Sequence, residues 1–283
     1  MHKDGYARLT ARCDERGNRI EEAYFDAKGQ PMLSANGIAK WTANYDERGN
    51  QIEVTYLDKA GNRVLRKDGY ARWTARYDER GKATEKAYFD EGGKLARSKD
   101  GYARWTARYD ERGNESEEAY FDEGGKPVQS KDGYARMVAS YDERRHLTDG
   151  AFFDEHGEKL YRVALSYDDE GHTTRREVSG LDGKDGFASK RQILDEKGNV
   201  IEGAYFDKGG KPVLSKDGYA RWTATYDEPG NQIKTTYLDA EGNPVPSKDG
   251  YERPKRGSRT KRKGATVSSW TGVRRHVMRN AEP

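Results

Sequence analysis

A repeat of 32 residues constrains this sequence more than any other feature. A Lys-Asp-Gly-Tyr element, or a variant of it, recurs at that spacing, breaks off once and then resumes. Its glycines are Gly5, Gly37, Gly69, Gly101, Gly133, Gly186, Gly218 and Gly250. A repeat of this length buries little surface alone and gains a core from its neighbours. The sequence therefore predicts an array of about eight repeats.

Apolar and polar residues alternate within each repeat, and this period of two is typical of β-strands. One face of such a strand is expected to hold Ala103, Trp105, Ala107 and Tyr109. The opposite face is expected to hold Tyr102, Arg104, Thr106 and Arg108. The positions equivalent to Trp105 and Tyr109 stay large and apolar in nearly every copy, so we expect them to form the core.

Turn motifs separate the expected strands. The sequence Asp-Glu-Arg-Gly-Asn at 110–114 has an Asp that can bond its own backbone and a Gly for a positive φ, which predicts a hairpin turn. A second turn of the form Asp-x-x-Gly follows the next strand, and a short extended segment such as Lys-Pro-Val then leads into Lys-Asp-Gly. Each repeat thus reads as strand, turn, strand, turn, short strand, turn.

We therefore expect an all-β fold, an elongated array of about eight 32-residue β-hairpin repeats over residues 1–250. The array is degenerate at 142–186, where one repeat is shortened, Arg145 replaces a turn glycine, and His146, His156 and His172 gather. A broken repeat can form a cleft, but decay of one copy explains the same features. The spacing of these histidines fits no standard set of metal ligands.

Two charged columns are expected on the polar face. The basic column contains Arg8, Lys40, Arg72, Arg104, Arg136 and Arg221, and the acidic column contains Glu21, Glu53, Glu85, Glu117, Asp149, Glu177 and Glu202. If the strand register brings them together, they form cross-strand ion pairs worth roughly 0.2–1 kcal/mol each. Within the basic column, the candidate residues for contact with a partner are Arg72, Arg104, Arg136 and Arg221.

No catalytic, cofactor-binding or metal-binding residues are predicted. Cys13 is the only cysteine, which excludes an internal disulfide and a Cys-based zinc site. The paired carboxylates lie in turns that recur in every repeat, whereas acid–base catalysis needs a carboxyl group in a dry pocket. The turns also lack the spacing of known calcium loops. We therefore expect a protein that is not an enzyme.

The segment Tyr109–Val128, read as YDERGNESEEAYFDEGGKPV, resembles the YD repeats of RHS-type proteins, and is similar more weakly to variant MORN and WG repeats. The resemblance covers about residues 1–250. It implies a β-rich protein, often exposed on a bacterial surface or secreted, that binds protein or carbohydrate or encloses a C-terminal toxin. No signal peptide or membrane-spanning segment is recognisable in the chain.

The segment 251–283 differs sharply in composition. It holds ten Lys or Arg against two Glu, a net charge of +8 in a chain of +3, and is expected to be disordered. Its candidate anion-binding residues are Lys255, Arg256, Arg259, Lys261, Arg262 and Lys263. Such a run can neutralise the phosphates of nucleic acid or of an acidic surface.

Three functions remain open at this point. The first is a non-enzymatic scaffold that presents a β-surface to a protein or a glycan. The second is an accessory repeat segment of a larger bacterial surface protein or polymorphic toxin. The third is binding of nucleic acid or an acidic surface through the basic tail. No cofactor is implied by any of them.

Overall fold

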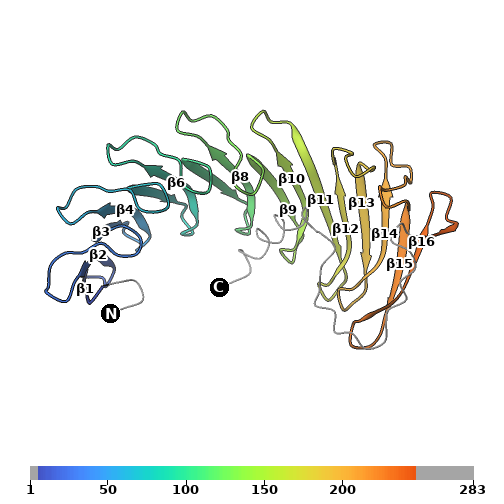
Figure 1. The fold of residues 1–283 in the computed structure, drawn as a ribbon, viewed down its shortest axis with the longest axis horizontal. Coiled ribbons are helices and arrows are strands. Elements are labelled where there is room, and N and C mark those ends of the chain that lie inside the picture. Colours follow the sequence, from blue (N-terminus) through green and yellow to red (C-terminus); the bar gives the residue numbers. More distant parts are fainter. Residues whose placement is uncertain (1–5, 247–283) are drawn as a thin grey trace. The chain divides into compact units, whose positions relative to one another are not determined.

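The computed structural model describes residues 6–246, and the chain is all-β over that range: its seventeen strands belong to one sheet, and no helix occurs among them (Figure 1). It divides into two compact units. Unit 1 runs to Met137 and includes Asp154–Gly157, and unit 2 comprises Val138–Phe153 and the described residues from Glu158 onward. Within residues 6–246, no helix is long and apolar enough to cross a membrane. The predicted disorder of 251–283 lies outside the described residues.

The strands of unit 1 are β1 (Arg8–Cys13), β2 (Arg19–Phe25), β3 (Lys40–Tyr45), β4 (Gln51–Leu57), β5 (Arg72–Tyr77), β6 (Ala83–Phe89), β7 (Arg104–Tyr109) and β8 (Glu115–Phe121). The next strand, β9 (Arg136–Tyr141), contributes its first two residues to unit 1 and the rest to unit 2. From β1 to β8, each strand pairs antiparallel with the next in the sequence.

The strands that lie wholly in unit 2 are β10 (Leu147–Phe153), β11 (Lys159–Tyr167), β12 (Thr173–Ser179), β13 (Ser189–Leu194), β14 (Val200–Phe206), β15 (Arg221–Tyr226), β16 (Gln232–Leu238) and β17 (Pro244–Val245). They too pair in sequence order. The shortened repeat is the one predicted: only five residues separate β10 from β11, and the Lys-Asp-Gly element is missing there.

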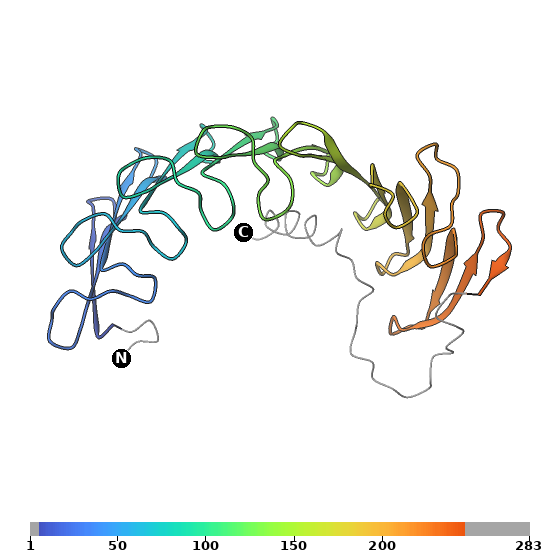
Figure 2. The same ribbon diagram turned by 45° about the horizontal axis from the view of Figure 1, so that its top comes forward.

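Two kinds of strand contact alternate along unit 1. Within a hairpin, such as β7 and β8, six residues pair across the turn. Between hairpins, such as β6 and β7, only three residues pair, and we call this contact a joint. A connector of two turns spans each joint, and both views show these connectors as loops beyond the strand ends (Figures 1 and 2).

The predicted turn chemistry is confirmed. In the turn at 46–50, Asp46 accepts hydrogen bonds from the backbone N–H of Arg48 at 3.0 Å and of Asn50 at 2.8 Å, and Gly49 has a φ of +85°. The short extended segment of each connector is reduced, however. In the connector after β8, this segment makes a single β-bridge, between Phe121 and Pro127. Among the connectors within residues 6–246, only the one after β16 forms a strand, the two-residue β17. Pro127 has no backbone N–H, so it cannot donate to a longer ladder.

Arg145 adopts the left-handed conformation of the glycine it replaces, with a φ of +71°. This conformation costs an L-residue roughly 1–2 kcal/mol, which glycine avoids. We expect Arg145→Gly to raise the free energy of unfolding by about 1 kcal/mol, measured by urea denaturation. The matched control is Gly198→Arg, at the same turn position with φ +77° and open space around it. A gain from Gly198→Arg, or a loss from Arg145→Gly, would contradict the account.

Candidate binding surface

The two faces of the sheet in unit 1 differ in their side chains. One face, which we call the aromatic face, carries Trp73, Ala75 and Tyr77 from β5 and Tyr88 from β6, where Trp73 is directly opposite Tyr88. The other, which we call the polar face, carries Arg72, Thr74 and Arg76 from β5. The alternation that the sequence predicted therefore holds along the strands.

A stack of tyrosine rings runs across the aromatic face of unit 1. Successive ring centroids are 4.6–5.9 Å apart, and the stack contains Tyr56, Tyr70, Tyr88, Tyr102, Tyr120 and Tyr134. Rings from even-numbered strands alternate with rings from the Lys-Asp-Gly-Tyr elements. In unit 2 a shorter stack holds Phe187, Tyr205, Tyr219 and Tyr237.

The assignment of Tyr102 to the polar face was wrong. The strand begins at Arg104, so Tyr102 belongs to the turn before it, where the period of two does not apply. Its ring packs against the core cluster that includes Trp73 and Tyr88. The smallest apolar residue of the motif, Ala103, is completely buried. The Lys-Asp-Gly-Tyr-Ala element is therefore a core-forming part of the connector.

The predicted core positions lie on the aromatic face, but most of them are only half-buried. Trp73 and Met137 are buried, whereas Trp41, Trp105 and Trp222 are half-buried. The tyrosines equivalent to Tyr109 have a further role, because their hydroxyls donate to a backbone carbonyl of the preceding hairpin. These bonds are 2.9–3.0 Å long, and the pairs are Tyr45 to Arg19, Tyr77 to Gln51, Tyr109 to Ala83 and Tyr226 to Val200.

The two charged columns of the polar face meet across the joints, as predicted. Each cation reaches the acid of the preceding hairpin, in the pairs Lys40–Glu21 (3.5 Å), Arg72–Glu53 (2.8 Å), Arg104–Glu85 (3.7 Å), Arg136–Glu117 (3.1 Å) and Arg221–Glu202 (2.6 Å). Arg162 pairs with Asp149 in the same way. These side chains are partly exposed to solvent, and surface pairs of this kind contribute about 0–1 kcal/mol each.

The proposed contact residues Arg72, Arg104, Arg136 and Arg221 are thus already engaged. The guanidinium of Arg72 also lies 4.1 Å from the ring centre of Phe89, and that of Arg104 lies 4.3 Å from Phe121. Such stacking and pairing hold the side chains in one conformation. Their contact with a partner stays a prediction, and the six candidate residues of the tail lie outside the described residues.

A second set of cations on the polar face is more exposed, and its members are not among the predicted contact residues. Arg12, Arg76 and Arg108 stand four residues after the basic column, and the side chain of Arg108 is 81% exposed. Arg108 contacts Glu117 at 3.4 Å, and Glu117 also pairs with Arg136. The strand alternation that puts Arg108 on the polar face also puts Arg12 and Arg76 there.

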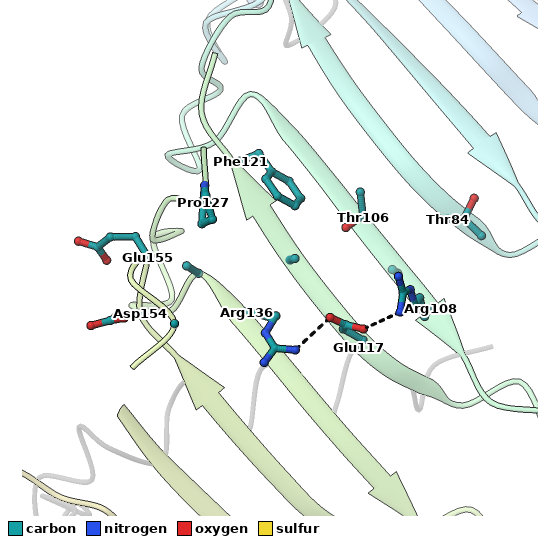
Figure 3. A pocket seen from close by; sticks show the side chains of 13 residues that line it. Thr84, Thr106, Arg108, Glu117, Phe121, Pro127, Arg136, Asp154 and Glu155 are labelled. Atoms are coloured by element: carbon teal, nitrogen blue, oxygen red, sulfur yellow. Dashed lines mark hydrogen bonds and ion pairs between the residues drawn. The ribbon is translucent and has the colours of Figure 1, made fainter. Parts of the chain in front are cut away.

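A shallow hollow of about 410 Å³ lies on the polar face of unit 1 (Figure 3). Arg108, Glu117 and Arg136 lie along one side of it, and Thr84 and Thr106 come from neighbouring strands. Phe121 and the turn at 154–157 lie toward the strand ends. The hollow therefore offers guanidinium and hydroxyl donors beside carboxylates, a combination suited to binding a polar ligand through hydrogen bonds.

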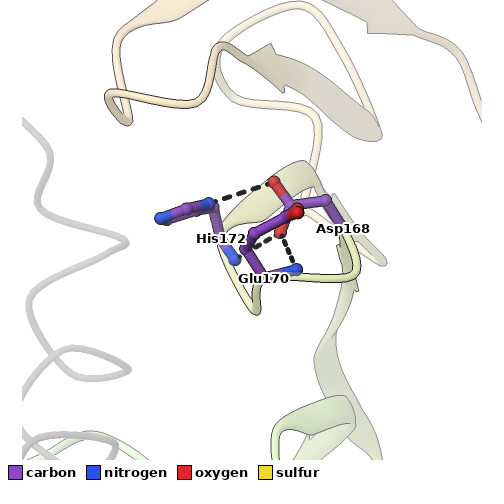
Figure 4. Close-up of side chains that lie close together, drawn as sticks. All are labelled: Asp168, Glu170 and His172. Carbon is purple, nitrogen blue, oxygen red and sulfur yellow. Dashed lines mark hydrogen bonds and ion pairs between the residues drawn. The ribbon is translucent and has the colours of Figure 1, made fainter.

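The degenerate region gathers Asp168, Glu170 and His172, whose ligand-type atoms lie within 4.8 Å of one another (Figure 4). The arrangement is that of an ordinary turn in this array. Asp168 accepts from the backbone N–H of Glu170 at 3.1 Å and of His172 at 2.7 Å, and it contacts the His172 ring nitrogen Nδ1 at 3.1 Å. His172 occupies the position of the turn asparagine, whose amide makes the same contact elsewhere. The three residues are brought together by the turn.

The turn aspartates give the fold a predictable response to acid. The side-chain amide of Asn50 donates to Asp46 at 2.8 Å and, with the backbone donors, lowers the pKa of that carboxyl below its usual value. A lowered folded pKa stabilises the fold above the unfolded value, and this contribution is lost as pH falls through the folded pKa. We expect Asp46→Asn to flatten the fall in unfolding free energy below about pH 4. An unchanged slope in urea denaturation at successive pH values would contradict this.

Comparison with known proteins gives no family. No family model matches the sequence, and no curated protein matches it. Among solved structures, the chain is similar to the Photorhabdus luminescens Tc holotoxin pore, at 12% identity over 82% of this chain and 13% of that chain, with a TM-score of 0.34. It is similar also to a porin-like protein from Bacteroides uniformis, at 9% identity over 82% of this chain and 88% of that chain, with a TM-score of 0.28. The chain spans 13% of the toxin chain, and membership of the YD/RHS family stays a prediction.

Proposed function

We propose that this chain is a non-enzymatic binding scaffold whose polar face in unit 1 contacts acidic groups of a protein or a glycan. One observation supports this most directly: the strand positions of that face hold eight cations and four acids. The cations are Arg8, Arg12, Lys40, Arg72, Arg76, Arg104, Arg108 and Arg136, and the acids are Glu21, Glu53, Glu85 and Glu117.

The excess is local and ordered. Arginine and lysine outnumber acids two to one on this face, although the chain as a whole is nearly neutral, at +3. Each acid pairs with a cation of the basic column, and Glu117 is shared between Arg108 and Arg136. Four acids therefore face eight cations, and the more exposed Arg76 and Arg108 present much of the remaining positive charge. Arginine binds carboxylate and sulfate groups through two parallel hydrogen bonds. A repeating row of such groups fits a partner with repeated acidic groups.

The test compares two double variants of equal charge. Arg76→Gln/Arg108→Gln removes two cations from the polar face, and Lys94→Gln/Lys126→Gln removes two exposed cations from connector turns of the same unit. We expect the first to weaken binding to immobilised heparin and to arrayed acidic glycans at least fivefold, and the second to leave it nearly unchanged. A wild-type chain that binds neither acidic glycans nor any protein in a pull-down, or equal losses in both variants, would refute the proposal.

A second proposal is that the scaffold serves as a repeat segment of a larger surface protein or toxin. It is supported by the Tyr-Asp-Glu-Arg-Gly-Asn motif together with the hairpin geometry that this motif adopts in the structure. An antibody against the repeats tests it on extracts of the source cells. A single band near 32 kDa would refute it, since that is the mass of this chain alone.

A further inference from the structure

The three joints between β2 and β7 are held by more than strand pairing. Three side-chain links recur at each: the cation–acid pair on the polar face, the tyrosine hydroxyl to a carbonyl of the preceding hairpin, and a basic side chain at the hairpin turn. In the last of these, Arg16 donates to the carbonyl of Glu47 at 2.6 Å, and Arg48 and Arg80 donate to Glu79 and Glu111 in the same way.

The last complete joint shows all three links in unit 2. Arg221 pairs with Glu202 at 2.6 Å, the Tyr226 hydroxyl donates to Val200 at 2.9 Å, and Lys197 donates to the carbonyl of Glu228 at 3.3 Å. The strand register is the one seen at the joints of unit 1, with Glu202 opposite Thr223 and Ala204 opposite Arg221. This joint therefore defines what a further hairpin would need from β16.

Strand β16 and its turn lack both of the side chains that they would have to supply. Lys234 stands at the position of Glu202, so the acid that pairs with the next cation is replaced by a cation. Pro229 stands at the turn position of Lys197, so that turn has no basic side chain to donate. Lys234 and Pro229 are both exposed, and the outer edge of β16 pairs with β17 only at Tyr237 and Leu238.

Strand β1 is altered in a complementary way. Cys13 takes the place of the tyrosine whose hydroxyl bonds the preceding hairpin, and Arg8 keeps the cation that pairs with a preceding acid. If the joint register were continued from β16 to β1 of another molecule, Arg8 would lie diagonally opposite Lys234. Like charges at such positions repel, and a lysine on an edge strand is a known means of discouraging strand addition.

We propose that β1 and β16 are capping strands that keep a second copy of this chain from adding end to end to the array. The three joints between β2 and β7 and the joint between β14 and β15 share one backbone register. A contact between β16 and β1 of a second copy in that register would differ from them in its side chains, so the side chains decide whether the two hairpins associate. With Lys234 and Pro229, β16 and its turn provide neither the acid nor the basic turn side chain, and with Cys13, β1 lacks the tyrosine hydroxyl. Capping of this kind does not require the proposed binding face.

The experiment restores the joint on the full chain. The variant Lys234→Glu/Pro229→Arg/Cys13→Tyr supplies all three links, and Lys234→Glu alone supplies the acid with one exposed substitution. We expect the triple variant to self-associate at least tenfold more tightly than the wild type, and the single variant to show a smaller increase. Sedimentation velocity over a range of concentrations in reducing buffer measures this.

The control reverses the charge on the other side of the same contact. Adding Arg8→Glu to the triple variant places a carboxylate on each side of the contact, at positions 8 and 234, and should return self-association to the wild-type level. Association of the triple variant no tighter than that of the wild type would overturn the proposal, as would association that Arg8→Glu leaves unchanged. Circular dichroism shows whether each variant keeps its β-structure. If the triple variant loses it, the comparison of Lys234→Glu with the wild type tests the proposal instead.

Discussion

Tyr134→Ala is expected to lower the free energy of unfolding by about 3–5 kcal/mol, the loss typical of removing a buried aromatic ring. The side chain of Tyr134 is 2% exposed, and its ring centre lies 5.7 Å from that of Tyr120 in the stack. Its hydroxyl donates to the buried carboxylate of Glu118 at 2.9 Å. Removing the ring therefore opens a cavity and also takes a donor from a buried charge. Urea denaturation followed by circular dichroism measures the loss.

Two controls accompany this variant: the first separates the lost hydroxyl from the lost ring, and the second tests the effect of burial. Tyr134→Phe keeps the ring and removes only the hydroxyl, so it should cost about 1–3 kcal/mol. Tyr6→Ala removes a half-buried ring at the end of the array, 5.2 Å from Tyr24, and should cost clearly less than Tyr134→Ala. Equal losses at Tyr6 and Tyr134 would show that the stack does not depend on burial by neighbouring repeats.

Local features of this fold could be read from the sequence because their causes are local. The Asp-Glu-Arg-Gly-Asn turn fixes its own geometry, since Asp46, Gly49 and Asn50 bond within five residues. The period of two fixes which strand residues share a face. The charged columns followed from the same alternation, and five of their pairs form as expected.

Features that depend on contacts between repeats were not readable in this way. The role of Arg80 is one case, because the carbonyl it reaches belongs to Glu111, 31 residues away. The Lys-Asp-Gly element is another. Lys99 pairs with Asp68 of the preceding element at 2.5 Å, so the motif links connectors, which its own sequence does not indicate.

The shortened repeat shows a third limit. The acidic column placed Glu177 in register with Glu117 by counting copies, but the turn at 168–172 sets Arg175 at that position and Glu177 two residues farther along. The ion pair is shifted in the same way: Arg191 Nε lies 3.2 Å from a carboxylate oxygen of Glu177. The guanidinium of Arg191 in turn lies 4.7 Å from the ring centre of Phe206. Counting repeats fails where a deletion changes the register, while the charge pairing survives by a shift of two residues.

Glu118→Ala is the second substitution with a large expected effect, and its neighbour Glu117→Ala is the matched control. Glu118 is 6% exposed on the aromatic face, where it accepts from the indole N–H of Trp105 at 2.6 Å and from the Tyr134 hydroxyl at 2.9 Å. These two donors belong to a hairpin and to the next connector, so one carboxylate joins successive repeats. Leaving both donors without this acceptor is expected to cost about 2–4 kcal/mol.

Glu117 points to the opposite face, where it is partly exposed to solvent and pairs with Arg108 and Arg136. Its replacement by Ala should cost less than about 1 kcal/mol, and less still at high salt, because exposed ion pairs are screened. Glu118→Gln keeps an acceptor oxygen for the two donors and should fall between the alanine variants, with little dependence on salt. The comparison is made by urea denaturation at low and high ionic strength. A loss from Glu117→Ala as large as that from Glu118→Ala would contradict this account. It would mean that the ion pairs of the polar face stabilise the fold as much as the buried Glu118 carboxylate does.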